Sequence, residues 1–211
     1  SYVANYDGKL VEVAPDEATF MPDMEAFEAA VTPKTKAVIV NNPNNPSGVV
    51  YSEATIKKIA SIMDKKQKEY GTEIYLIADE PYRELVYDGV TVPFLTKYYD
   101  NTIVGYSFSK SLSLPGERIG YLVIPDEVVD AGMLQSAAGV ATRILGFVNA
   151  PTLMQRAVAR CLDAEVNVEA YDKNRRALYD GLTKLGFECI KPQGAFYLWV
   201  KAPGKDEKKL V

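Results

Sequence analysis

The chain has 211 residues, 47% of them hydrophobic and 25% charged, which is enough for one large domain or for one domain and part of another. No apolar run is long enough to cross a bilayer, and a formal net charge of −4 argues against nucleic acid as the main partner. Histidine is absent, so histidine-activated nucleophiles are excluded and no metal site is expected.

The first expected elements are a short strand over residues 9–13 and an amphipathic helix over residues 24–30 that ends near Pro33. The chain opens on Ser1 in the middle of a pattern and without an initiator methionine. We therefore expect it to be a piece of a longer protein.

A strand–helix–strand unit follows. Residues 37–40 and 74–78 are β-branched and apolar, as strands are, and residues 55–70 between them carry an apolar stripe at helical spacing. Ser52 can cap this helix and Gly71 can end it. The order predicts two parallel strands joined by a right-handed crossover.

Two more strands are expected over residues 102–106 and 119–124, with a polar loop between them. The sequence leaves the direction of the second of these open. Residues 126–141 look helical, and residues 152–185 give a long helical pattern with a bend or a break.

The C-terminal pattern changes after Gly186, where the long helix is expected to end. Residues 187–190 and 195–200 then read as strand, turn and strand. Two strands packed on a long helix indicate the start of a second, smaller α+β domain. The two cysteines, Cys161 and Cys189, are far apart in sequence and suggest a reducing, cytoplasmic setting.

Polar residues follow three of the predicted strands, over 41–48, 79–82 and 107–110. Because the carboxyl ends of parallel strands meet at one edge of a sheet, these runs should face one site. Lys110 is the most informative residue among them. A lysine at the mouth of a buried strand is partly withdrawn from water, and its amine can then attack a carbonyl carbon.

Four motifs, in this order, closely resemble the fold-type I, pyridoxal-phosphate-dependent aminotransferases of class I/II, and the resemblance covers essentially the whole chain. The motifs are Asn45-Pro46-Ser47-Gly48, Asp79 to Tyr82, Ser107 to Gly120 and Gly194 to Trp199. The resemblance implies an α/β fold with a three-layer, mostly parallel open sheet. It also implies a large cofactor-binding domain over residues 1–165 and the start of a small C-terminal domain over 166–211.

The same resemblance gives roles to individual residues. Lys110 corresponds to the lysine that forms a Schiff base with pyridoxal 5'-phosphate and later moves the proton. Asp79 corresponds to the partner of the pyridine nitrogen, and Asn45 and Tyr82 to the hydrogen-bond partners of the phenolic oxygen. Taken alone, Asp79 could cap a helix, Asn45 could belong to an ordinary turn and Tyr82 could be a packed aromatic.

Ser107, Ser109 and Arg118 correspond to the phosphate-binding set, because hydroxyls donate to phosphate and arginine holds it bidentately. The alternative for Arg118 is a surface ion pair with Glu117. The family's arginine for the substrate carboxylate and its glycine-rich phosphate turn have no counterpart within these residues. We therefore expect this chain alone to transaminate poorly or not at all.

The resemblance implies transfer of an amino group between an L-amino acid and a 2-oxo acid, by an enzyme that is usually a homodimer. Two alternatives share the fold. A pyridoxal-phosphate-dependent β-lyase or cyclopropane-forming synthase would differ in its products, since elimination gives pyruvate with ammonia. A sensor domain of a transcription regulator would carry a basic DNA-binding module upstream. A catalytically inactive relative is disfavoured by the intact motif residues.

Overall fold

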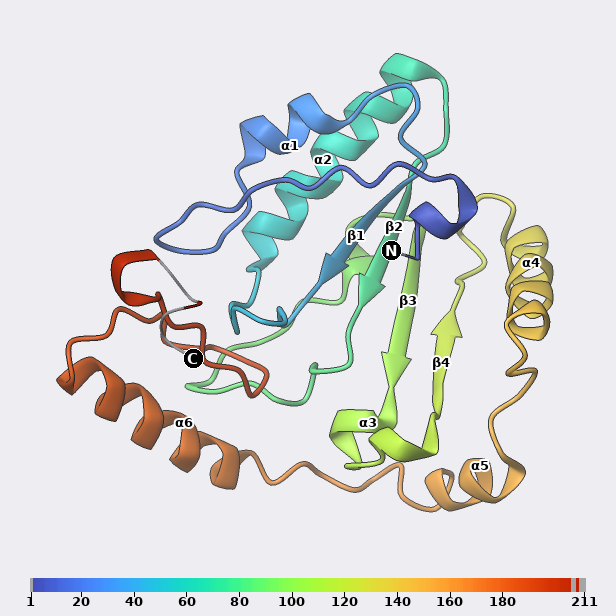
Figure 1. Cartoon of the computed structure of the whole chain (residues 1–211). Helices are drawn as coiled ribbons and strands as arrows, with labels where there is room; N and C mark the ends of the chain where they lie inside the picture. Colours follow the sequence, from blue (N-terminus) through green and yellow to red (C-terminus); the bar gives the residue numbers. More distant parts are fainter. Residues whose placement is uncertain (1, 206–207, 209–211) are drawn as a thin grey trace.

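The computed structural model describes residues 2–205 and 208, and in this part the chain forms an α/β fold on a four-stranded open sheet (Figure 1). The strand order is β1-β2-β3-β4, with β1, β2 and β3 parallel to one another and β4 antiparallel to β3. The predicted mostly parallel sheet is confirmed, and the direction of the last strand is now settled. The strands are β1 (Ala37–Asn41), β2 (Tyr75–Asp79), β3 (Thr102–Ser107) and β4 (Gly120–Val123).

Helices α1 (Met24–Ala30) and α2 (Glu53–Tyr70) form a layer over one face of this sheet (Figure 1). The Ser52 side chain caps α2 by accepting a hydrogen bond from the backbone of Thr55, and Gly71 ends the helix in the left-handed conformation, both as predicted. The apolar stripe of α2 packs on the sheet and contributes to the core. The buried residues of this core include Ile56, Ile59, Ala60 and Met63 of α2 and Leu76 and Ala78 of β2.

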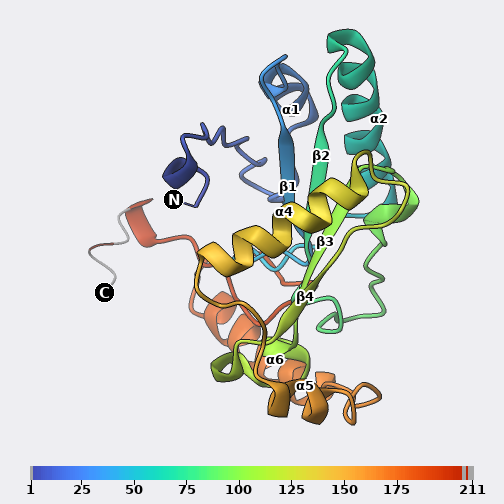
Figure 2. The ribbon, with the colours of Figure 1, turned by 90° about the vertical axis from the view of Figure 1, so that its right-hand side faces the viewer.

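Of the other α-helices in the described residues, one lies between β3 and β4 in the sequence and three follow β4. Helix α4 lies on the β4 side of the sheet (Figure 1), so that it is in front of the strands when the sheet is viewed from that side (Figure 2), and every residue of β4 is exposed. In the described residues no helix combines the length and the apolarity that crossing a membrane requires. The α-helices are α3 (Phe108–Ser111), α4 (Ala131–Ile144), α5 (Thr152–Val158) and α6 (Val168–Lys184). The short 3-10 helices are Ala4–Tyr6, Leu95–Lys97, Pro115–Glu117 and Pro203–Lys205.

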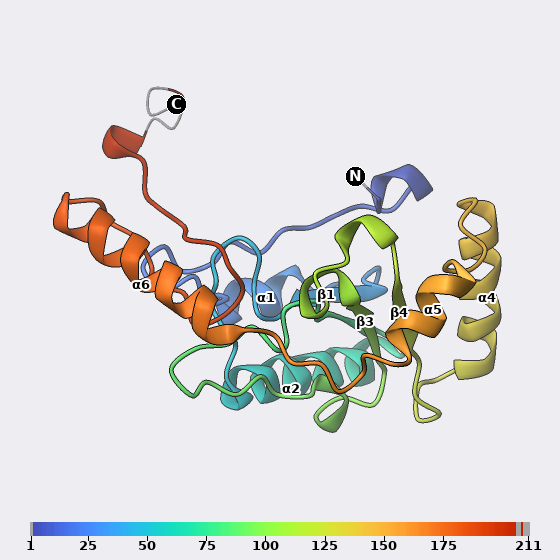
Figure 3. The same ribbon diagram turned by 90° about the horizontal axis from the view of Figure 1, so that it is seen from below.

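Some sequence-based elements are wrong or differ in extent. Residues 9–13 form no strand, because no neighbouring segment pairs with them in the described part of the chain. The helix expected over 126–141 begins five residues later, after turns. The pattern over 152–185 is divided by residues 159–167 into α5 and α6, which an extended connection separates (Figure 3). Asn167 accounts for the break, since its side chain caps the start of α6.

The predicted strands over 187–190 and 195–200 are also absent as regular strands; only Cys189 and Val200 form an antiparallel bridge. The physical reason is that the backbone of Ala195 bonds elsewhere. Its N–H donates to the carbonyl of Leu85 at 2.8 Å, and its carbonyl accepts from the hydroxyl of Tyr87 at 2.5 Å. The middle of the C-terminal segment is therefore attached to the loop after β2. The two predicted strands pair only at their outer ends, where the N–H of Lys201 donates to the carbonyl of Glu188 at 2.8 Å.

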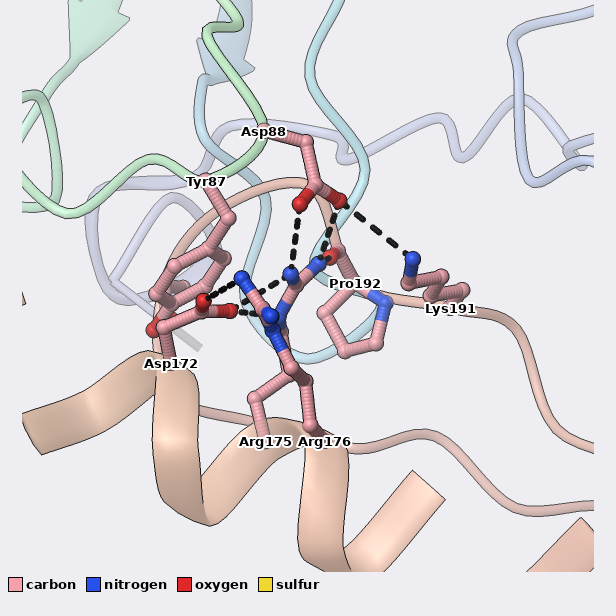
Figure 4. A network of polar contacts seen from close by, with 8 residues as sticks. Tyr87, Asp88, Asp172, Arg175, Arg176, Lys191 and Pro192 are labelled. Carbon is pink, nitrogen blue, oxygen red and sulfur yellow. Dashed lines mark hydrogen bonds and ion pairs between the residues drawn. The ribbon is translucent and has the colours of Figure 1, made fainter. Parts of the chain in front are cut away.

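Arg175 attaches α6 to the same region (Figure 4). Its side chain is 4% exposed and makes two hydrogen bonds of 3.0 Å to the carboxylate of Asp88 and one of 2.8 Å to Asp172. It also donates to the carbonyl of Pro192 at 2.7 Å and lies over the ring of Tyr87. One arginine thus joins α6, the loop after β2 and the C-terminal segment, which gives all three a fixed arrangement.

Candidate active site

The polar runs that follow β1, β2 and β3 meet at one edge of the sheet, as predicted. Asn41, the last residue of β1, lies opposite Asp79, the last residue of β2, and Asp79 lies opposite Gly105 in β3. The parallel register places these strand ends side by side. Ser107 ends β3 and begins the turn of α3, which carries Lys110. The residues from three distant stretches of sequence are therefore neighbours.

Asn41 links two of the predicted site residues, although the sequence reasoning gave it no role. Its amide donates to the carboxylate of Asp79 and to the carbonyl of Asp79, each at 3.0 Å. Its side-chain oxygen accepts from the backbone N–H of Asn45 at 2.6 Å. Asn41 therefore holds the acidic strand end and the following turn together. Its position opposite Asp79 in the strand register is the signal that could have identified it.

Asp79 is an exposed carboxylate, and in the described residues no cation forms a salt bridge with it. Partial desolvation raises the pKa of its carboxyl, and the hydrogen bond from Asn41 lowers it by a smaller amount. The negative charge of the ionised Asp79 carboxylate is thus only partly stabilised by the hydrogen bond from Asn41. A cationic N–H group placed against Asp79 would supply the missing charge and bring the pKa down.

Tyr82 and Asn45 come together as predicted, and a third polar group joins them. The amide of Asn45 donates to the hydroxyl of Tyr82 at 3.4 Å and to the hydroxyl of Tyr197 at 3.3 Å. The two hydroxyls are 2.7 Å apart and share a hydrogen bond. Burial, and then the hydrogen bond with Tyr197, raise the pKa of Tyr82 well above its ordinary value. Tyr82 therefore keeps its proton at physiological pH.

Lys110 lies in α3, half-buried, beside the same aromatic groups. Its Nζ is 5.0 Å from the ring centroid of Phe196 and 5.6 Å from that of Tyr82. Ammonium groups at such distances are attracted by the ring faces. The amine is therefore directed toward the Tyr82 cluster, on the side of the sheet where the strand ends meet.

The predicted phosphate-binding set is brought together only in part. Ser107 and Ser109 are half-buried and adjacent, with hydroxyl oxygens 2.7 Å apart, and the backbone N–H of Ser109 donates to the Ser107 hydroxyl at 3.1 Å. Arg118 is exposed in a left-handed conformation (φ 51°), and its guanidinium donates to the carbonyl of Pro115 at 2.5 Å. Within the described chain no hydrogen bond joins Arg118 to either serine.

The sequence reasoning missed Tyr197 and Phe196 as site residues. Both lie in the segment Gly194 to Trp199, which was noted as a family motif but given no role in a site. Phe196 contacts the ring of Tyr82 edge to face, with centroids 5.5 Å apart. The spacing of residues in this segment does not predict that its aromatic side chains contact the loop after β2. That contact depends on the course of the chain between them.

Replacing Asp79 by asparagine tests the electrostatics of this site. The pKa of Asp79 is higher in the folded chain than in the unfolded chain, so the folded state binds the proton more tightly. The free energy of unfolding therefore falls as pH rises from the unfolded-state pKa to the folded-state pKa. Asp79→Asn should therefore raise the free energy of unfolding near pH 7, measured by urea denaturation, by up to about 0.5 kcal/mol, since solvent screens an exposed group. The gain should vanish near pH about 3, where both states are protonated. A loss of stability at pH 7, or a gain that persists at low pH, would contradict the assignment.

Comparison with known proteins places the chain in a family. A family model described as "Aminotransferase class I and II" matches residues 1–211. Among curated relatives, a probable aspartate/prephenate aminotransferase of Thermus aquaticus is 34% identical over 190 residues, which cover 89% of this chain and 48% of that protein. The aromatic-amino-acid aminotransferase 2 of Thermococcus litoralis is 32% identical, with 96% of this chain and 52% of that protein covered.

Solved structures agree. A crystal structure of an amino transferase from Eubacterium rectale superposes with a TM-score of 0.92 and is 55% identical, covering 95% of this chain and 50% of that one. The chain thus spans about half the length of the relatives that it matches. The resemblance inferred from the motifs is confirmed at the level of the family and the fold.

Proposed function

The chain belongs to the class I and II aminotransferases, and from this premise we propose that the whole protein is a pyridoxal-phosphate-dependent aminotransferase. It would transfer an amino group between an L-amino acid and a 2-oxo acid. The observation that carries the proposal is a convergence at one sheet edge. The carboxylate of Asp79, the hydrogen-bonded pair Asn45 and Tyr82, and the amine of Lys110 all lie there.

The chemistry of these side chains fits the proposed cofactor. Asp79 is a carboxylate without a cationic partner in the described residues, which suits a protonated ring nitrogen. Tyr82 is a neutral donor, which suits an anionic phenolic oxygen. Ser107 and Ser109 offer hydroxyl donors for a phosphate group, with Arg118 as the cation on the neighbouring loop. Bound pyridoxal phosphate would supply an aldehyde that captures amines and a ring that withdraws electrons from the substrate's α-carbon.

Each residue then has a defined task. Lys110 would use its Nζ for the covalent link and, once released, would take the proton from the α-carbon and return it. Asp79 would keep the ring nitrogen protonated, and Asn41 would orient the carboxylate. Tyr82 and Asn45 would donate to the phenolic oxygen. Arg118 would turn from Pro115 toward the phosphate.

The substrate class and the assembly are also proposals. Relatives are named for aspartate, prephenate and aromatic amino acids, so we propose a dicarboxylic or aromatic amino donor. We further propose a homodimer, a cytoplasmic location, and a division at residue 165 between a large cofactor-binding domain over 1–165 and a smaller C-terminal domain over 166–211.

Product analysis tests the function. The whole protein should convert L-aspartate or L-phenylalanine to the corresponding 2-oxo acid only when a second 2-oxo acid is present, and should release a new amino acid in equal amount. The measurement is chromatography of both products together with an ammonia assay. In a parallel reaction with cystathionine, whose β-carbon carries a sulfur leaving group, pyruvate and ammonia formed without an acceptor would show elimination and would contradict amino transfer. A sensor domain would bind the cofactor and give neither set of products.

A further inference from the structure

Tyr197 is the polar group in the candidate site to which no role has been assigned. Its hydroxyl is 2.7 Å from that of Tyr82 and 3.3 Å from the amide nitrogen of Asn45. The Tyr82 and Tyr197 rings meet edge to face with centroids 5.7 Å apart. Tyr82 is 4% exposed, so its hydroxyl has few partners besides these two side chains.

Counting hydrogen-bond donors shows what Tyr197 does to Tyr82. A hydroxyl has one proton and two lone pairs, and the amide of Asn45 has two N–H groups and lies within reach of both hydroxyls. One of these N–H groups donates to Tyr82, which leaves the other for Tyr197 or for a ligand. The two hydroxyls have two protons between them, and one of these protons forms the hydrogen bond that joins them. If Tyr197 donates this proton, the Tyr82 oxygen accepts from both Tyr197 and Asn45, and the Tyr82 proton is free to be donated to a ligand. If Tyr82 donates instead, its proton is used and it can only accept a hydrogen bond from a ligand. An anionic ligand oxygen beside Tyr82 requires the first arrangement.

The backbone around Tyr197 is fixed closely enough to support such a role. The N–H groups of Gln193 and Gly194 both donate to the carbonyl of Gly48, at 2.8 and 2.9 Å. A Cβ atom on Gly194 would lie 2.7 Å from the side chain of Pro43, so the segment touches the turn that carries Asn45. With Ala195 bonded to the loop after β2, the segment leading to Tyr197 is held on two sides.

We propose that Tyr197 is a positioning residue of the cofactor site, which donates its proton to Tyr82 and so directs the Tyr82 proton to an anionic phenolic oxygen of the ligand. This inference rests on the proposed function. Because Tyr197 acts through Tyr82, it requires no contact with the ligand of its own. A donor whose oxygen accepts two hydrogen bonds is polarised and donates more strongly, so the pair would stabilise the ionised oxygen more than Tyr82 alone.

The test uses two ligands that differ at one atom. Pyridoxal phosphate and its 3-deoxy analogue, which lacks the phenolic oxygen, are titrated into the whole protein and followed by absorption and by intrinsic fluorescence. Tyr197→Phe should weaken binding of pyridoxal phosphate about three- to tenfold and leave binding of the analogue unchanged. In the Tyr82→Phe background, Tyr197→Phe should have no further effect, as expected when one residue acts through another.

Tyr171→Phe is the matched control. Tyr171 stacks on Phe196 in the same aromatic cluster, with centroids 5.9 Å apart, and its hydroxyl makes no hydrogen bond in the part of the chain that the structure describes. It should bind both ligands as the unmodified chain does. Equal losses for both ligands in Tyr197→Phe, or an additional loss in the Tyr82→Phe background, would overturn the inference and leave the proposed function standing. An unmodified whole protein that binds neither ligand would contradict the cofactor assignment, and the inference with it.

Discussion

Lys110→Ala is expected to abolish the covalent adduct that the chain forms with pyridoxal phosphate. The amine of Lys110 lies beside the rings of Phe196 and Tyr82 at the edge of the sheet, where the proposed cofactor contacts converge. Without this amine the aldehyde has no nucleophile in the site. The measurement is borohydride reduction of the cofactor-treated chain, followed by mass mapping of the labelled peptide, which should contain Lys110 only in the unmodified chain.

Two controls separate the chemistry from the fold. Lys110→Arg keeps a cation over the two aromatic rings but has no amine that can form the link, so it should fold normally and remain unlabelled. Lys57→Ala removes an exposed lysine of α2 that pairs with Glu53, and it should leave the labelling unchanged. A label that persists in Lys110→Arg, or that maps to a different lysine, would remove Lys110 from the site.

Arg175→Met is expected to cost about 3 kcal/mol of unfolding free energy, the lower end of the range for breaking a buried ion pair, because the partner Asp88 is half exposed. The loss arises from the unmet hydrogen bonds of Asp172 and of the Pro192 carbonyl as well as from Asp88. Urea unfolding followed by circular dichroism measures it. Arg176→Met is the matched control, since Arg176 is exposed and pairs only with Asp172 at the surface, so its cost should stay below about 1 kcal/mol.

The same variant has a pH signature. Hydrogen bonds from Arg175 lower the pKa of Asp88 to about 2 in the folded chain. A carboxyl with a depressed pKa contributes stability that is present above its unfolded pKa, about 3.9, and is lost as pH falls toward the folded pKa. The difference between the unmodified chain and Arg175→Met should therefore shrink between pH about 4 and pH about 2. A difference independent of pH over that interval would assign the effect to packing alone.

Local signals predicted the central part of the fold well. The structure contains the strands predicted to begin near residues 37 and 74, and it contains the predicted helix cap at Ser52 and helix end at Gly71. Each of these features follows from a pattern within a few residues. The convergence of Asp79 and Asn45 at one edge follows from parallel strand order, which the sequence also indicates.

What the sequence could not predict depends on contacts between distant segments. Alternation over residues 9–13 suggests a strand, but a strand needs a partner, and none pairs with it in the described residues. The predicted C-terminal hairpin is reduced to one bridge between Cys189 and Val200, because the bonds of Ala195 go to Leu85 and Tyr87. Tyr197 enters the site for the same reason. The roles given to Ser107, Ser109 and Arg118, the domain division and the homodimer stay predictions.

The amide of Asn41 has a consequence for ligand selection. It binds the carboxylate of Asp79 on one side and the turn bearing Asn45 on the other, so it sets the spacing between the acidic contact and the contacts to the phenolic oxygen. A heteroaromatic ligand satisfies both only if its ring nitrogen and its hydroxyl are separated by that spacing. Asn41, one side chain at the end of a strand, would then decide whether the site accepts a six-membered ring or a larger or differently substituted one. The shape of a surrounding cavity would not be needed for this selection.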